Sequence, residues 1–147
     1  MNKLLNFSAN LLLGLGILDL FRGFMHTFNI MWASQNVAKI EPLPDSLVLM
    51  GAFGISNYLT GAIYILVWKK AKFLAPYILG LIPMTYLLGA IGLQFAGVEA
   101  QAEFKGKYMM LVYNGLCMIT AVTYFFFNRG NKESVVSHNR QALKEEY

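Results

Sequence analysis

Four stretches of mainly apolar residues, each about twenty residues or longer, divide the chain. They cover about residues 4–32, 47–68, 73–95 and 108–127. A helix needs about 20 apolar residues to cross the hydrocarbon core of a bilayer, since it rises about 1.5 Å per residue. The pattern therefore predicts an all-α integral membrane protein, a four-helix transmembrane bundle over residues 1–128. Residues 129–147 are polar and are predicted to form a cytoplasmic tail.

The composition is too apolar and too sparsely charged for an ordinary soluble domain. The 147 residues are 56% hydrophobic and only 14% charged, whereas soluble domains average about 25% charged residues. The formal net charge of +4 comes from basic residues beside the apolar stretches. These residues form no basic patch interleaved with aromatic residues, as nucleic-acid binding requires. We therefore expect membrane lipids, and not nucleic acid, among the partners.

The distribution of Lys and Arg predicts the orientation in the membrane. Eight of these residues lie before the first apolar stretch, between the second and third, or after the fourth, and three lie in the other two connections. Because Lys and Arg concentrate in cytoplasmic loops, both termini are predicted to be cytoplasmic. The expected location is the bacterial inner (cytoplasmic) membrane.

The connections between the apolar stretches differ in length and character. Residues 33–46 contain Pro42 and Pro44, which interrupt a helix, so we expect a short surface helix or a flap over the outer ends of the bundle. The link at residues 69–72 is short, which predicts that the second and third stretches are antiparallel neighbours.

The first apolar stretch carries the clearest functional signal. Asp19, Arg22 and His26 are spaced i, i+3 and i+7, which places them on one face of a helix. Each ionisable side chain in a membrane helix costs roughly 2.5–3.5 kcal/mol to insert. These three side chains are therefore predicted to face protein or water and not lipid.

Each of the other stretches also has a face with polar or small residues. In the second, Asn57 lies between Gly54 and Gly61, and small residues allow another helix to approach closely while an amide bonds across the contact. The remaining candidates for binding in the bundle interior come from the third and fourth stretches: Tyr86, Tyr113 and Asn114. Counted from the outer ends of the spans, these polar residues are predicted to meet in the outer half of the membrane.

Two interpretations of the charged pair remain open. Asp19 and Arg22 either pair along the helix and fix its packing, or they serve a ligand, since a buried ion pair alone contributes little net stability. His26 is either a satisfied interior histidine or a proton-transfer group, and it is the one weak catalytic candidate. No second histidine lies in an apolar stretch, so no metal or haem is expected. The single cysteine, Cys117, is predicted to be a small packing residue.

The arrangement resembles the DoxX-like and EXPERA-type membrane bundles. The stretches that carry the resemblance are LLLGLGILDLFRGFMH in the first span and KKAKFLAPYILGLIP around the second connection, together with an outer loop containing prolines. In EXPERA-type proteins, buried carboxylates on more than one helix hold a cationic centre. Here only Asp19 corresponds, and Asn57 stands where a second acid is expected. The DoxX-like resemblance implies a small membrane protein, in some cases associated with redox partners.

Three functions are consistent with these features. The first is a binding protein whose polar interior accepts a small lipophilic or lipid-like molecule. Arg22 would hold an anionic or carbonyl oxygen in that site. The second is an accessory subunit of a larger membrane complex, redox complexes included, with the polar stripe docking a partner protein or another copy of the chain. The third is a membrane enzyme that uses His26 for proton transfer.

Overall fold

A computed structural model describes the backbone of residues 3–98 and 106–145, with side chains in these ranges as far as Phe127. All regular structure in these ranges is helical, without strands. The elements are α1 (Lys3–Thr27), α2 (Ile30–Ala33), the π-helical turn η1 (Ser34–Ala38), α3 (Pro44–Lys70), the 3₁₀ turn η2 (Lys72–Leu74), α4 (Ala75–Phe95) and α5 (Gly106–Glu145). The all-α prediction is confirmed for this part of the chain.

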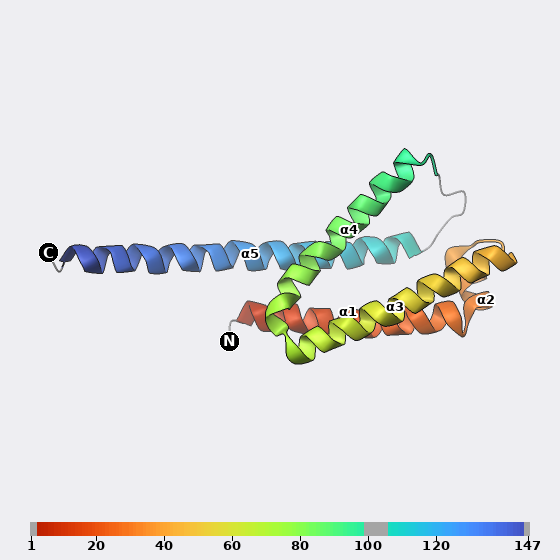
Figure 1. Cartoon of the computed structure of the whole chain (residues 1–147), viewed down its shortest axis with the longest axis horizontal. Coiled ribbons are helices and arrows are strands. Elements are labelled where there is room, and N and C mark those ends of the chain that lie inside the picture. The colour runs from red at the N-terminus through yellow and green to blue at the C-terminus, as the bar shows by residue number, and fades with distance from the viewer. Residues whose placement is uncertain (1–2, 99–105, 146–147) are drawn as a thin grey trace.

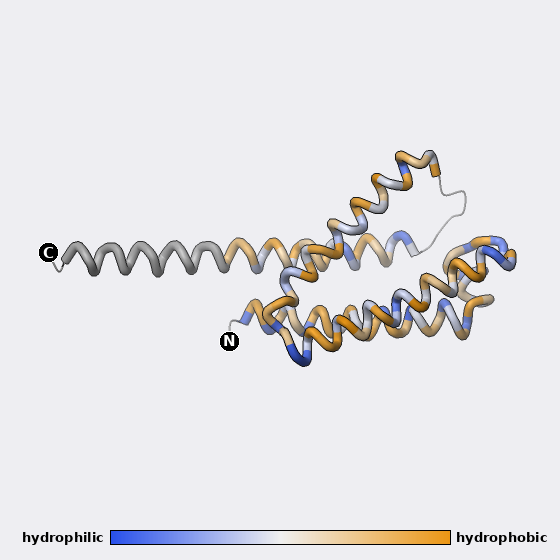
Figure 2. The backbone as a smooth tube through the Cα atoms, in the orientation of Figure 1, coloured by the Kyte–Doolittle hydropathy of each residue, from blue (hydrophilic) through white to orange (hydrophobic). Residues whose placement is uncertain are grey.

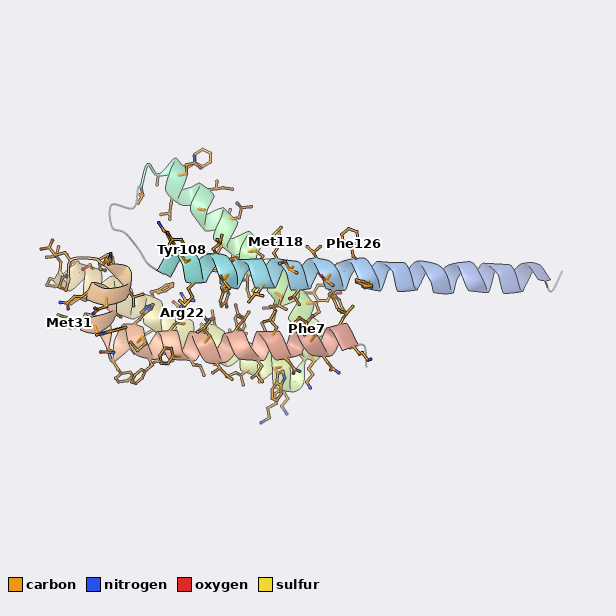
Figure 3. The ribbon with its side chains drawn as sticks, turned by 180° about the vertical axis from the view of Figure 1, so that it is seen from behind. Phe7, Arg22, Met31, Tyr108, Met118 and Phe126 are labelled. Carbon is orange, nitrogen blue, oxygen red and sulfur yellow. The ribbon has the colours of Figure 1, made fainter. Side chains whose placement is uncertain are left out.

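Four helical segments in the described residues are long and apolar enough to cross a membrane: Lys3–Thr27, Pro44–Lys70, Lys72–Phe95 and Gly106–Phe127. Figure 2 shows that apolar residues predominate along these segments, and many of the large apolar side chains are exposed. On α5, for example, Met118 is 58% exposed and Phe126 is 76% exposed (Figure 3). A surface of this kind is stable against lipid and unfavourable in water, which supports a membrane protein.

The first helix is shorter than its apolar pattern predicts. It ends at Thr27, whereas the pattern continues to residue 32. Phe28 and Asn29 form a turn, and the apolar residues beyond it belong to α2 and η1, which fold back before α3 begins at Pro44. The expected short helix in this connection is present. Hydropathy alone did not locate the turn, because Ile30 to Trp32 are as apolar as a membrane span.

The helices α1 and α3 pack tightly and antiparallel, side by side along their lengths (Figure 1). Two glycine pairs make this contact: Gly16 with Gly61, and Gly23 with Gly54. A Cβ atom added to Gly61 would lie 2.7 Å from the carbonyl oxygen of Gly16, so the backbones touch directly. The prediction that another helix approaches the Gly54–Gly61 face is confirmed.

The second pair, α4 and α5, packs around small residues. Ala75 and Leu79 of α4 join Cys117 and Ala121 of α5 and Leu12 of α1 in one buried cluster. Cys117 is fully buried in this cluster, as predicted for a packing residue. After the η2 turn, α4 diverges from α3 and crosses α5 (Figure 1). The prediction that α3 and α4 pack as neighbours therefore holds only beside the turn.

One end of the bundle carries most of the basic residues at the described helix ends, whereas Lys107 lies in the first turn of α5 at the other end. Lys3 begins α1, Lys69 and Lys70 end α3, and Lys72 begins η2. Figure 1 places the N-terminus at this end, and α5 continues past it as an unbroken helix through Glu145. The tail predicted for residues 129–147 is thus helical in its backbone as far as Glu145.

Candidate functional site

The pair formed by Asp19 and Arg22 lies in the interior of the bundle. Asp19 is 4% exposed and Arg22 is 8% exposed. Nη1 of Arg22 donates to Oδ1 of Asp19 at 3.2 Å, because residues three apart lie on one face of α1. The predicted pairing along the helix is therefore present, and the two opposite charges compensate each other where hydration is lost.

The carboxylate of Asp19 is also held from two other helices. The hydroxyl of Tyr113 on α5 donates to Oδ2 at 3.2 Å. The hydroxyl of Thr60 on α3 lies 3.4 Å from the same oxygen and also within reach of two backbone carbonyls of its own helix. Asp19 thus connects α1, α3 and α5, and its negative charge accepts donors from all three.

The guanidinium of Arg22 is less completely satisfied than the carboxylate. Nη2 donates to the thioether sulfur of Met110 on α5 at 3.6 Å, and a thioether is a weak acceptor. Nε is buried and has no hydrogen-bond partner among the described residues. The Arg22 guanidinium also lies over the ring of Phe53, 5.7 Å from its centroid. Nε and Nη2 form one edge of the guanidinium, and the hydrogen bond found for this edge within the described structure goes to the Met110 sulfur.

His26 lies one turn beyond Arg22 and faces α3. Its Nδ1 is 3.5 Å from the side-chain nitrogen of Asn57, and its ring packs against Phe53 with the centroids 5.5 Å apart. The predicted polar contact of Asn57 with another helix is therefore made to α1.

A polar cavity of about 220 Å³ lies beside the charged pair. Five of the seven predicted site residues line it: Asp19, Arg22, Asn57, Tyr86 and Tyr113. His26 does not line the cavity itself but contacts two residues that do, Asn57 and Phe53. Asn114 does not line it, because its Nδ2 donates to the backbone carbonyl of Met110 and its Oδ1 is buried without a partner in the described structure.

The polar cavity opens towards the gap between α3 and α4. Ser56 of α3 and Thr85 and Tyr86 of α4 line the cavity and are all exposed. These hydroxyl groups lie well inside the apolar helices, where a bare lipid-facing surface would carry few polar groups. The divergence of α4 from α3 therefore creates a lateral opening to the polar interior.

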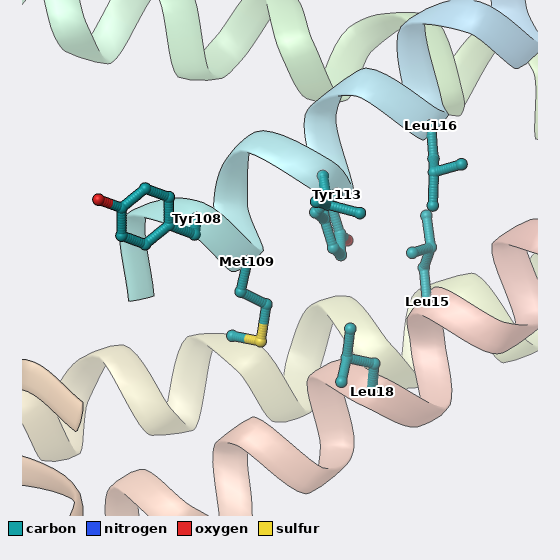
Figure 4. A pocket seen from close by; sticks show the side chains of 7 residues that line it. Leu15, Leu18, Tyr108, Met109, Tyr113 and Leu116 are labelled. Carbon is teal, nitrogen blue, oxygen red and sulfur yellow. The ribbon is translucent and has the colours of Figure 1, made fainter. Parts of the chain in front are cut away.

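Two apolar cavities adjoin the same group of residues. One, of about 270 Å³, lies under α2 and η1, with Trp32, Ala33 and Val37 on one side and Arg22 and His26 on the other. The other, of about 390 Å³, separates α1 from α5, where Leu15 and Leu18 point towards Met109, Tyr113 and Leu116 (Figure 4). Arg22 lines both the polar cavity and the cavity under α2, so the two adjoin at this side chain.

Several residues of the site were not identified from the sequence. The most important are Thr60, Phe53, Thr85 and Met110. Thr60 and Phe53 lie three residues after and four residues before Asn57, so helical spacing could have found them. Met110 gives no such signal, because its role depends on how α5 packs against α1.

The distances of Arg22 and Asn57 from their helix ends also differ from those obtained by counting residues from the outer ends of the apolar stretches. Arg22 lies five residues from the end of α1, or about 7.5 Å, whereas Asn57 lies thirteen residues from the start of α3, or about 20 Å. The two are nevertheless level, since the contact between Gly23 and Gly54 sets the register. Span ends inferred from hydropathy could not supply this register.

The chain matches no protein-family model, no curated protein and no solved structure. The resemblance to DoxX-like and EXPERA-type bundles therefore stays a prediction. The described residues also contain no group of three His, Cys, Asp or Glu side chains placed to hold a metal ion.

Proposed function

We propose that the protein binds a small lipophilic molecule in the polar cavity of its bundle, with Arg22 as the principal contact. The molecule enters from the bilayer through the opening between α3 and α4. Its oxygen-bearing group accepts hydrogen bonds from the edge of the Arg22 guanidinium formed by Nε and Nη2, where Nε has no partner in the described structure. Asp19 keeps that edge in position through its bond to Nη1, and Asn57, Tyr86 and Tyr113 form the surrounding polar wall.

The observation that carries this proposal is the unpartnered Nε of Arg22 beside a cavity. A buried donor without a partner costs about 1–3 kcal/mol, and most buried polar groups are bonded. A ligand oxygen at this position would remove the cost, and the neighbouring cavity provides space for it.

The burial of the charged pair also bears on the alternative functions. A stripe that docks a partner protein or a second copy lies on the outside of the bundle, whereas Asp19 and Arg22 are buried. Proton transfer by His26 requires a substrate's reacting group within hydrogen-bond reach of the imidazole, whereas Nδ1 of His26 faces the amide of Asn57. Both observations favour binding over docking and catalysis.

The test uses the molecules that co-purify with the protein. Wild-type protein and the Asp19→Asn, Arg22→Gln double variant are purified from membranes in the same mild detergent. Bound small molecules are then extracted and compared by mass spectrometry. We expect one class of lipophile to be enriched in the wild type and depleted in the double variant, whose charges are removed as a pair so that it folds.

Tyr108→Phe serves as the control, since Tyr108 is 67% exposed and lies outside the polar cavity. This variant should retain the enriched molecule. Equal extracts from a folded double variant and the wild type would contradict the proposal.

We further propose that the basic end of the bundle faces the cytoplasm, in a bacterial inner membrane, with both termini on that side. The Lys-rich ends of α1 and α3 support this orientation. In a Cys117→Ala background, a membrane-impermeant thiol reagent should label Asn36→Cys from outside intact cells and should not label Lys70→Cys. Labelling at Lys70→Cys alone would reverse the orientation.

A further inference from the structure

The charges around the polar cavity are already balanced before any ligand binds. Asp19 and Arg22 are the only residues with a formal charge in its lining as described, and they pair with each other. A ligand carboxylate or phosphate beside Arg22 would add a second anion close to Asp19. An uncompensated charge in a low-dielectric interior is costly, so the site favours an uncharged ligand group.

The donors beside the pair converge on a single weak acceptor. Nη2 of Arg22 donates to the sulfur of Met110 at 3.6 Å, and the hydroxyl of Tyr86 donates to the same sulfur at 3.7 Å. These two donors come from α1 and α4, while the sulfur belongs to α5. A carbonyl oxygen has two lone pairs and accepts two such bonds better than a thioether does. Methionine is also flexible enough to move aside.

The cavity on the other side of Arg22 fits the remainder of such a molecule. It measures about 270 Å³ and its lining is almost wholly apolar, with Phe21, Met25 and Trp32 among its walls. Ligand sites are commonly apolar, with a few polar groups that fix orientation. Since Arg22 lines both cavities, a molecule whose oxygen lies at Arg22 can extend its hydrocarbon part beneath α2 and η1.

We infer that the ligand is an uncharged lipophile with a carbonyl group, whose oxygen replaces the Met110 sulfur between the Nε–Nη2 edge of Arg22 and the hydroxyl of Tyr86, and whose hydrocarbon part lies against Trp32. This inference rests on the proposed function and names the chemical class of the ligand. Arg22 and Tyr86 hold the carbonyl, and the walls under α2 exclude water from the hydrocarbon.

The position of Trp32 provides a direct test, since the chain has two tryptophans. A Trp68→Phe variant in detergent leaves Trp32 as the only tryptophan, whose emission is excited selectively over that of the tyrosines. Bromine atoms quench tryptophan on close approach, so the probes are methyl 9,10-dibromostearate and the free acid, 9,10-dibromostearate. The measurement is made at about pH 9, where the free acid is ionised. We expect the methyl ester to quench Trp32 at lower concentration than the acid.

Two controls separate site binding from partition into the micelle. A Trp32→Phe variant, which reports through Trp68 at the opposite end of the bundle, should show no preference for the ester, because Lys72 lies over the Trp68 ring and attracts the acid. Adding Tyr86→Phe to the Trp32 reporter should raise the ester concentration for half quenching about 2- to 10-fold, as expected for one lost hydrogen bond. Tyr77→Phe, on the same helix but outside both cavities, should leave it unchanged.

Stronger quenching of Trp32 by the acid than by the ester would overturn the inference that the ligand is uncharged. The proposed function would then stand with an anionic ligand. Equal quenching of Trp32 and Trp68 by the ester would overturn the placement of the hydrocarbon part. Equal effects of Tyr86→Phe and Tyr77→Phe would overturn the carbonyl contact. The co-purification experiment depends on none of these probes, so the proposed function fails only if that experiment fails.

Discussion

The two contacts made by α1 differ sharply. Against α3, the backbones touch at two glycine pairs, which leave no room there for a larger side chain. Against α5, apolar side chains that include Met109 line an open cavity of about 390 Å³ (Figure 4). The same helix is therefore fixed rigidly on one side and packed loosely on the other, and the buried charges lie where the two sides meet.

The difference shows how a small bundle can hold an open polar interior. Glycine contacts gain van der Waals packing over a long interface, which stabilises the α1–α3 pair. Because that pair fixes Asp19 and Arg22, α4 and α5 can remain splayed around them. We therefore expect substitutions in the tight contact and in the charged pair to affect folding, and those at the cavity walls to affect binding.

The largest effect is expected when one member of the charged pair is removed. Asp19→Asn or Arg22→Gln alone leaves an uncompensated buried charge, which costs about 3–5 kcal/mol, and the double variant should recover much of this loss. Melting temperatures of the three variants in one detergent measure the recovery. Purely additive losses would show that the pair does not act as a unit.

Overpacking the tight contact should come next. A larger side chain at Gly61 meets the backbone of Gly16, and overpacking typically costs about 1–3 kcal/mol. Gly61→Leu should therefore lower the melting temperature clearly. Gly89→Leu is the matched control, because an added Cβ at Gly89 meets nothing within 4 Å. Equal melting of the two variants would refute the glycine contact.

A smaller effect is expected for Tyr113→Phe, on the loosely packed side. The substitution removes the bond from α5 to Asp19, and bonds between membrane helices contribute about 1–2 kcal/mol in model peptides. The contribution of this bond is the difference in unfolding free energy between Tyr113→Phe and the control Tyr108→Phe. Tyr108 lies in the same helix but is exposed. A loss of stability in both variants would point to a general aromatic effect.

The smallest effect is expected at the basic end of the α1–α3 pair. Nε1 of Trp68 donates to the side chain of Asn10 at 3.1 Å, in an exposed position. Bonds between membrane helices average about 0.6 kcal/mol in double-mutant cycles, so Asn10→Ala should lower the melting temperature only slightly. A loss as large as that of Gly61→Leu would mean that glycine packing is not the main source of stability in this pair.

The sequence by itself determined the helical class, the four apolar segments and the inward direction of Asp19 and Arg22. These features follow from hydropathy and from the 3.6-residue period, which act within one helix. The glycine face around Asn57 could be recognised in the same way. Five of the seven proposed site residues line the polar cavity for this reason.

The tertiary structure decided what depends on the relation between helices. The turn at Phe28 and Asn29, the register of Gly23 with Gly54, and the divergence of α4 from α3 have no signature in the pattern of one segment. Met110 reaches Arg22 across 88 positions of the chain, while Asn114, one turn further along α5, bonds to its own helix. Such contacts depend on how far apart the helix axes lie and how each helix is rotated, and side-chain spacing along one segment contains neither quantity.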